Sequence, residues 1–149
     1  MNPLLDIHGL TLHYAGEGRT IHAVDDVSLT LSQAGEAIGI VGESGSGKTS
    51  LATALMRLLP KNVRRFEGQM LLDGRDISAL PEETFRREVR WREIAMVFQG
   101  AMNVLNPVLR IGEQIAEPLF VNEGVPRDAA LKRAGETLER VGLPTTMLH

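Results

Sequence analysis

The 149-residue sequence predicts an α/β fold with a β-rich N-terminal part and a helical C-terminal part. Two strand-like segments of alternating polarity occupy the first 31 residues. A glycine-rich loop then joins a short apolar run to a helical pattern, and two more helical patterns follow residue 100. This length suits one ordinary domain with a single hydrophobic core.

The first predicted strands are Leu5–Tyr14 and Thr20–Leu31, with a turn at residues 15–18 between them. After a second turn, Ala37–Val41 is an unbroken apolar run. Such a run is typical of a strand buried on both faces, as in a parallel sheet. We therefore expect a core strand directly before the glycine-rich loop.

The spacing of apolar residues predicts a helix over Thr49–Leu59, which Pro60 ends. Gly68–Leu72 predicts another strand, and residues 73–74, Asp-Gly, are a strong hairpin signal. Pro81 opens a short helix over Glu82–Arg90, since proline is well tolerated in a first helical turn.

Ile94–Phe98 predicts a further strand, and Met102–Pro107 is expected to be irregular. Two helices follow, over Gly112–Val121 and Pro126–Val141, and Gly142 is the expected cap of the second. The apolar stripe of that last helix contains Leu131, Ala134, Leu138 and Val141.

Composition excludes several classes of function. The net charge is −3, so no basic surplus indicates a nucleic-acid partner. The arginines at 86, 87, 90 and 92 alternate with glutamates, which favours a solvated helix face. The absence of cysteine excludes disulfides and thiolate metal sites. We see no signal peptide and no apolar run long enough to cross a bilayer, so any membrane role is expected to be peripheral.

The chemistry is concentrated in one loop, whose sequence matches G-x-x-x-x-G-K-[ST] in full. Its residues are Gly42, Glu43, Ser44, Gly45, Ser46, Gly47, Lys48 and Thr49. Glycines let the backbone wrap closely around phosphates, and the following helix adds its positive N-terminal end. Lys48 supplies a mobile positive charge, and Thr49 offers a hydroxyl to Mg²⁺. The alternative is a Gly/Ser-rich surface turn, but the strand-loop-helix context favours phosphate binding.

Beyond this loop, the chain resembles the N-terminal part of an ABC-type ATPase, and specifically the peptide/nickel importer group of ABC transporters. Leu10–Tyr14, Ala23–Leu29 and Gly39–Thr49 resemble the opening stretch of that family. Val97–Val108 resembles the Q-loop region that is typical of the peptide importers. The resemblance covers essentially the whole chain and implies a partial P-loop NTPase fold, with an N-terminal antiparallel β region and the start of a helical subdomain.

Carried over residue by residue, the resemblance implies that Tyr14 stacks on adenine and that Gly42–Thr49 and Ser50 bind the phosphates. It also implies that Gln99 reaches Mg²⁺ and the attacking water. An aromatic face suits a purine, and an amide can meet both a metal and a water. Strand packing is the alternative role for Tyr14, and an exposed loop position is the alternative for Gln99.

The implied cofactors are ATP and Mg²⁺. The implied partners are transmembrane permease subunits, a second ABC ATPase subunit and, indirectly, a solute-binding protein, with no nucleic acid. Such a subunit lies peripherally on the cytoplasmic face of the membrane and drives import of peptides or a related solute. Residues 1–98 would form a nucleotide-binding portion, and residues 99–149 the Q-loop and the start of the helical subdomain.

Several family elements do not occur in these residues: the signature segment, the Walker B aspartate with its catalytic glutamate, and the switch histidine. Met70–Asp73 superficially resembles a Walker B strand but runs into a glycine turn with no following glutamate, which favours a hairpin. We therefore expect a truncated piece that binds nucleotide weakly at best and does not turn it over alone.

The remaining residues give little indication of a second site. The histidines at 8, 13, 22 and 149 have no metal-binding spacing, so ordinary strand and surface roles are expected. Two alternative functions stay open: a soluble ABC protein acting on DNA or ribosomes, and another P-loop kinase or GTPase.

Overall fold

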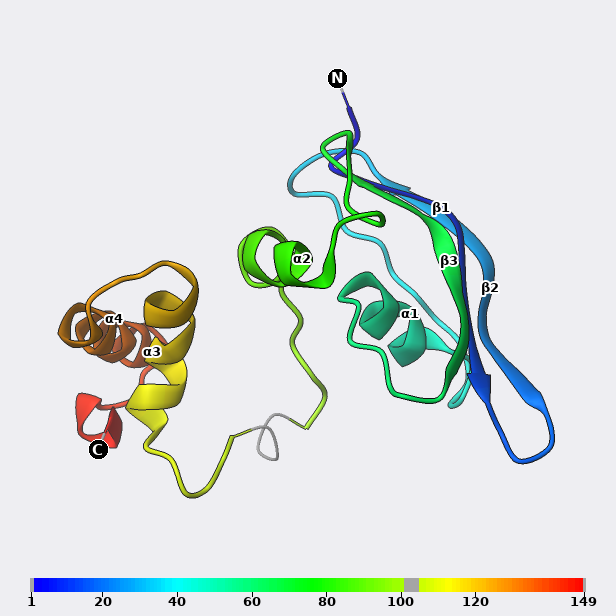
Figure 1. The fold of residues 1–149 in the computed structure, drawn as a ribbon. Coiled ribbons are helices and arrows are strands. Elements are labelled where there is room, and N and C mark those ends of the chain that lie inside the picture. The colour runs from blue at the N-terminus through cyan, green and yellow to red at the C-terminus, as the bar shows by residue number, and fades with distance from the viewer. Residues whose placement is uncertain (1, 101–104, 149) are drawn as a thin grey trace. The chain divides into compact units, whose positions relative to one another are not determined.

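The computed structural model describes residues 2–100 and 105–148. The chain forms two compact units, Met1–Met96 and Val97–His149, and each is described by itself. The first contains a four-stranded sheet with two helices, and the second is helical (Figure 1). The division of one domain into functional portions 1–98 and 99–149 stays a prediction.

The sheet of the first unit has the strand order β2-β1-β3-β4, and all neighbouring strands are antiparallel. The strands are β1 (Leu5–Ala15), β2 (Thr20–Leu31), β3 (Val63–Leu72) and β4 (Arg75–Asp76). The first two predicted strands are thus confirmed, and the third is longer than expected. Residues 70–73, which superficially resemble a Walker B strand, enter the β3–β4 hairpin, so the prediction of a hairpin there is confirmed.

That hairpin turns at Asp73 and Gly74, as predicted. Leu72 pairs with Arg75 across the turn. Asp73 has φ 49° and Gly74 has φ 81°. A two-residue turn with both central φ values positive matches the right-handed twist of its strands, and Asp-Gly tolerates it well.

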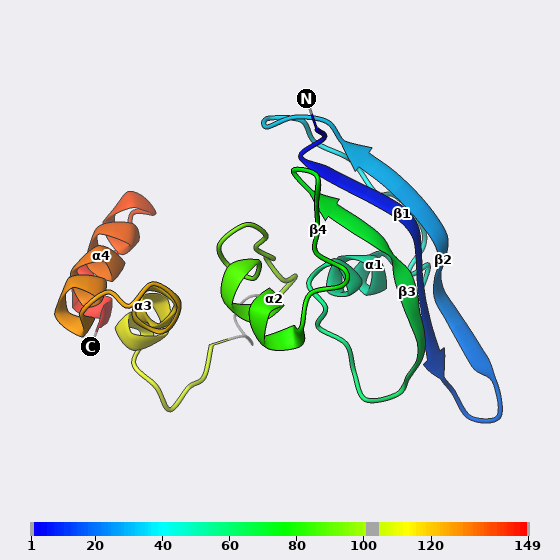
Figure 2. The ribbon, with the colours of Figure 1, turned by 45° about the horizontal axis from the view of Figure 1, so that its top comes forward.

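Helices α1 (Lys48–Leu55) and α2 (Glu82–Glu88) complete the core. In both views α1 lies against one face of the sheet (Figures 1 and 2). The fully or nearly buried cluster joins sheet and helices: Ile7, Leu10, Leu12, Val24, Leu51, Ala54, Met70, Ile77, Phe85 and Val89. Loss of this apolar surface from water holds the unit together.

Helix α1 ends four residues before the predicted Leu59. Leu58 donates its backbone N–H to Thr53 and Arg57 donates to Ala54, while Arg57 has φ 51°. This is a Schellman motif with arginine at the position that glycine usually occupies. The guanidinium group of Arg57 also donates to the carbonyl of Leu80 at 2.7 Å, which helps to hold this residue in place.

Two predicted strands are wrong. Residues 37–41 have no strand structure and are exposed, with Val41 94% exposed. Residues 94–98 form no strand beyond an isolated bridge between Ile94 and Arg90. A buried strand needs neighbours that accept its backbone hydrogen bonds, and none of the described strands pairs with either run.

The prediction of a solvated arginine face is partly wrong as well. Arg86 and Arg87 are exposed. The guanidinium group of Arg90 is instead largely buried and donates to the carbonyls of Met56 and Arg57 at 2.7 and 2.8 Å. It also pairs with Glu82 at 2.8 Å, so Arg90 ties the end of α1 to α2.

The second unit contains α3 (Ile111–Asn122), α4 (Arg127–Arg140) and the short 3₁₀ helix η2 (Thr145–Leu148). Its buried centre consists of Ala116, Ala130 and Ala134. Both predicted helices are confirmed, and Gly142 ends α4 with φ 77°. The irregular segment predicted at 102–107 lies outside the described residues as far as Val104.

The predicted apolar stripe of α4 is mostly correct. Ala134 and Leu138 are buried, and Leu131 is partly buried. Val141 is 67% exposed, because the helix already ends at Arg140. Among all described residues, no helix combines the length and apolar character that a bilayer crossing requires.

Phe85→Ala tests the core of the first unit. The ring is fully buried, and the guanidinium carbons of Arg57 and Arg90 lie 4.8 and 5.4 Å from its centroid. We expect the free energy of unfolding to fall by about 3–5 kcal/mol. Urea denaturation followed by fluorescence of Trp91, the single tryptophan, measures this.

Phe98→Ala is the size-matched control for this substitution. Phe98 is 39% exposed and belongs to the second unit. Its loss should change the Trp91 transition by less than about 1 kcal/mol. Equal destabilisation by the two substitutions would contradict the described core.

Candidate phosphate-binding site

The glycine-rich loop approaches the sheet at Gly47. Gly47 has φ 93° and is the N-cap residue of α1. A Cβ added there would lie 2.0 Å from the carbonyl oxygen of Ala23 on β2. Only glycine allows both this backbone conformation and this approach. The requirement for glycine at this position is therefore steric as well as conformational.

The start of α1 has free donors for an anion. No side chain caps the helix, and its first turn contains no acidic residue. The first helical bond runs from Leu51 N–H to the carbonyl of Gly47, so the amides of Lys48, Thr49 and Ser50 precede it. Unpaired amides and the positive end of the helix dipole together favour phosphate.

Lys48 folds back over the loop. Its ammonium group donates to the carbonyls of Gly42 and Glu43 at 2.8 and 2.6 Å, and to the Ser46 hydroxyl at 3.2 Å. These contacts place the positive charge directly above the glycine-rich loop. A phosphate that entered the loop would meet this charge and could replace the carbonyls as its partner.

A hollow of about 630 Å³ lies beside the loop. It is lined by residues 22–25, 27 and 29 of β2, by residues 39–42 and 46–48 of the loop region, and by Leu51 of α1. Valine and leucine side chains line one part, and Lys48 and Ser46 supply a polar part. This volume and this mixture suit a ligand with both a charged end and an apolar face.

The remaining loop residues are accessible. Glu43, Ser44, Gly45 and Thr49 are exposed, and Ser50 is half-buried. Thr49, whose hydroxyl is the predicted Mg²⁺ ligand, is thus an exposed residue at the start of α1. The structure brings all the predicted loop residues, 42–50, together at one place.

Tyr14 lies at the end of β1, where its neighbours across the sheet are Ile21 and Val63. The ring is half-buried and packs against the core of the first unit. The described residues that line the hollow do not include it. Strand packing therefore accounts for this side chain as it stands, and adenine stacking stays a prediction.

Gln99 is exposed in a turn of the second unit. It belongs to a different compact unit from the glycine-rich loop, so its role toward Mg²⁺ and water also stays a prediction. Four of the residues that carried the Q-loop resemblance, 101–104, lie outside the described residues.

The structure also assembles a cluster that sequence reasoning missed. His13 of β1 pairs in register with His22 of β2, and their rings stack with centroids 3.8 Å apart. Both imidazoles face the carboxylate of Asp25. Hydrogen bonds from His13 and then His22 lower the pKa of Asp25 below its ordinary value. A search for histidine spacings along one element cannot find residues that meet across a hairpin.

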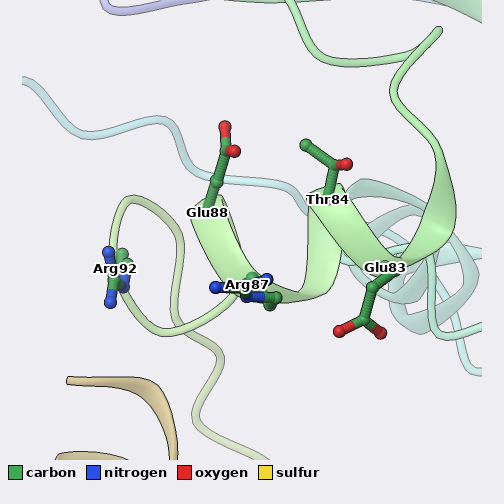
Figure 3. A pocket seen from close by; sticks show the side chains of 5 residues that line it. All are labelled: Glu83, Thr84, Arg87, Glu88 and Arg92. Atoms are coloured by element: carbon green, nitrogen blue, oxygen red, sulfur yellow. The ribbon is translucent and has the colours of Figure 1, made fainter. Parts of the chain in front are cut away.

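A second hollow, of about 280 Å³, lies at α2 and the turn after it. Its lining is entirely polar or charged: Glu83, Thr84, Arg87, Glu88 and Arg92 (Figure 3). Glu83 already pairs with Arg86, and Glu88 with Arg75. Figure 3 shows these side chains pointing in different directions, so they form no convergent binding site.

The loop, its lysine and the uncapped helix have the arrangement of a P-loop phosphate-binding motif. The profile of the family described as ABC transporter matches residues 24–148. The chain belongs to this family.

Relatives of known name are similar along nearly the whole chain. A Brucella abortus protein named as a peptide import ATP-binding protein is 45% identical over 148 residues, which cover 95% of this chain and 43% of that protein. The oligopeptide transport ATP-binding protein OppD of Bacillus subtilis is 41% identical over 142 residues, covering 95% and 39%. The chain thus spans less than half the length of these relatives.

A solved structure is similar in fold. It is described as a dimeric, post-hydrolysis state of the ATP-binding cassette MJ0796 bound to ADP and Pi. The TM-score is 0.75 at 26% identity, over 97% of this chain and 60% of that one. The β-rich and helical parts of this chain are therefore parts of an ABC ATPase fold.

Gly47→Ala tests how the loop is positioned. The added methyl group would collide with the Ala23 carbonyl, so we expect loss of binding of a fluorescent ATP analogue and a lower melting temperature. Gly35→Ala is the matched control, because Gly35 also has a positive φ (86°) and open space around its Cβ position but lies outside the glycine-rich loop. Equal effects of both substitutions would show that the contact with β2 is not required.

Proposed function

We propose that this chain is the nucleotide-binding front part of an ATP-binding subunit of an ABC importer for peptides or a related solute. The observation that carries the proposal is the cradle formed by the glycine-rich loop, with the Lys48 ammonium group above it and uncapped α1 amides behind it. The identity with peptide import ATP-binding proteins supports the class of solute.

In this proposal the triphosphate of ATP occupies the loop. The amides of Lys48, Thr49 and Ser50 donate to phosphate oxygens, and the Lys48 ammonium group exchanges its loop carbonyls for the outer phosphates. The purine and ribose extend along the hollow beside β2. Tyr14 stacks on the adenine after a change of its packing.

Mg²⁺ fits the donors available here. Hydroxyl and amide oxygens are ligands that this hard cation accepts, and Thr49 is an exposed residue at the start of α1. Thr49 and Gln99 would hold the ion, which would supply neutralisation of phosphate charge. Gln99 would also orient the attacking water, as the family resemblance implies.

The proposed partners follow from the family and its named members. Permease subunits would receive the helical second unit, and a second ABC ATPase subunit would pair with this one, since the similar cassette is described as dimeric. A solute-binding protein would act indirectly through the permease. The subunit would lie peripherally on the cytoplasmic face of the membrane.

The decisive test of the proposed site is Lys48→Ala. Removing the ammonium group deletes a charge-assisted contact with phosphate, which is worth about 1.5–3 kcal/mol. We expect the Kd for MgATP to rise at least about tenfold. Equilibrium binding of a fluorescent ATP analogue, with competition by unlabelled ATP, measures this change.

Lys61→Ala, an exposed lysine of the same unit, is the control and should bind like the unmodified chain. Steady ATP hydrolysis is expected from neither, because the Walker B aspartate and the catalytic glutamate of the family do not occur in these residues. Binding that is indifferent to Lys48 in a folded chain would contradict the proposal.

A further inference from the structure

We propose that His13, His22 and Asp25 form a binding site for a divalent transition-metal ion of the zinc class. The site is separate from the Mg²⁺ expected at the phosphates. It is built on the β1–β2 hairpin, and its three ligand atoms lie within 4.8 Å of one another.

A bulge in β2 creates the cluster. Leu12 pairs with Val24 while His13 pairs with His22, so Ala23 is an extra residue without a partner. One extra residue reverses the alternation of side chains between the two faces of a strand. His22 and Asp25 therefore share a face although they are three positions apart, and His13 meets them from β1.

The distances between ligand atoms suit a single ion. Nε2 of His13 lies 2.9 Å from Oδ1 of Asp25, and Nδ1 of His22 lies 3.5 Å from Oδ2. Two ligands of a tetrahedral zinc ion, each about 2.0–2.1 Å from it, are roughly 3.3 Å apart. The three ligand atoms lie within 4.8 Å of one another, so side-chain rotation would have to shorten the widest separation for all three to bind one ion.

The donor set selects the class of ion. Two imidazole nitrogens and one carboxylate oxygen are ligands that Zn²⁺, Co²⁺ and Ni²⁺ accept, whereas Mg²⁺ and Ca²⁺ prefer oxygen alone. Three protein ligands leave a fourth position for water. Metal binding requires neutral imidazoles whose lone pairs point at the ion, so it should weaken as the histidines become protonated.

The exposed fractions of the three side chains support a solvent-accessible site in which one ligand is held in place. The ring of His13 is 6% exposed, whereas the side chains of His22 and Asp25 are 56% and 63% exposed. An ion can therefore enter from solvent and meet one preoriented ligand. On the neighbouring strand β3, Arg65 pairs with Glu67 and also interacts electrostatically with Asp25, so a bound cation would compete with this arginine for the Asp25 charge.

The competing interpretation is a purely structural cluster, in which both imidazoles donate N–H groups to the Asp25 carboxylate. A simpler pair of this kind exists on β1, where Nε2 of His8 lies 3.0 Å from Oδ2 of Asp6. That pair is a natural control, because it has a histidine and a carboxylate but no second imidazole on the same carboxylate.

The experiment is a titration of the full chain with Co²⁺ and Zn²⁺ in the absence of nucleotide. We expect one Co²⁺ per chain with the visible absorption of a four-coordinate ion, displacement by Zn²⁺, and a higher melting temperature with either metal. His22→Ala and Asp25→Asn, both at exposed positions, should each weaken binding at least about tenfold, whereas His8→Ala should not.

His13→Ala removes a buried ring and could prevent folding, so the conclusion does not depend on it. No saturable binding to the folded chain, or binding that survives both His22→Ala and Asp25→Asn, would overturn the proposal. Because nucleotide is absent, these outcomes are independent of whether the glycine-rich loop binds ATP.

Discussion

The close approach of Gly47 to the Ala23 carbonyl positions the rest of the candidate site. It fixes the end of the glycine-rich loop against the sheet and sets where α1 begins. Leu51 and Ala54 of that helix then enter the core. The uncapped amides and the Lys48 ammonium group consequently lie close together, at the start of a helix that apolar burial holds against the sheet. A larger residue at 47 would separate the loop from the sheet that supports it.

Ala23 on β2 affects both the glycine-rich loop and the histidine cluster. As the extra residue of the bulge, it presents its carbonyl to Gly47 and also brings His22 and Asp25 onto one face. The nucleotide cradle and the proposed metal cluster thus depend on the same local irregularity. His22 and Asp25 line the hollow beside the loop as well, so the two sites are neighbours on β2. Bulges often redirect side chains next to functional sites in this way.

Local patterns predicted the elements that local interactions determine. The Asp73-Gly74 turn, the two strands around the first hairpin and helices α3 and α4 follow from turn chemistry and periodicity. Residues 37–41 have the composition of a core strand, but a strand exists only with paired neighbours, and none of the described strands pairs with this run. The end of α1 was missed because arginine, at residue 57, occupies a position where glycine is expected.

The site shows the same division between local and non-local information. The loop motif could be recognised from sequence because its eight residues are contiguous and act through their own backbone. The cluster of His13, His22 and Asp25 depends on the register of two strands. If residue 15 is paired with residue 20 and residue 14 with residue 21 across the predicted turn, His13 comes to lie opposite His22. This register was the available sequence signal for the pair of histidines. The bulge that adds Asp25 has no comparable sequence signature.

The central claim is that the loop itself grips the triphosphate. Titrating the ¹⁵N-labelled chain with MgATP and following backbone amide resonances by NMR tests it most directly. The account predicts saturable shifts concentrated at Gly45–Ser50, with smaller changes along β2. A folded chain whose loop amides do not respond at millimolar MgATP, or respond no more than those of α4, would contradict it.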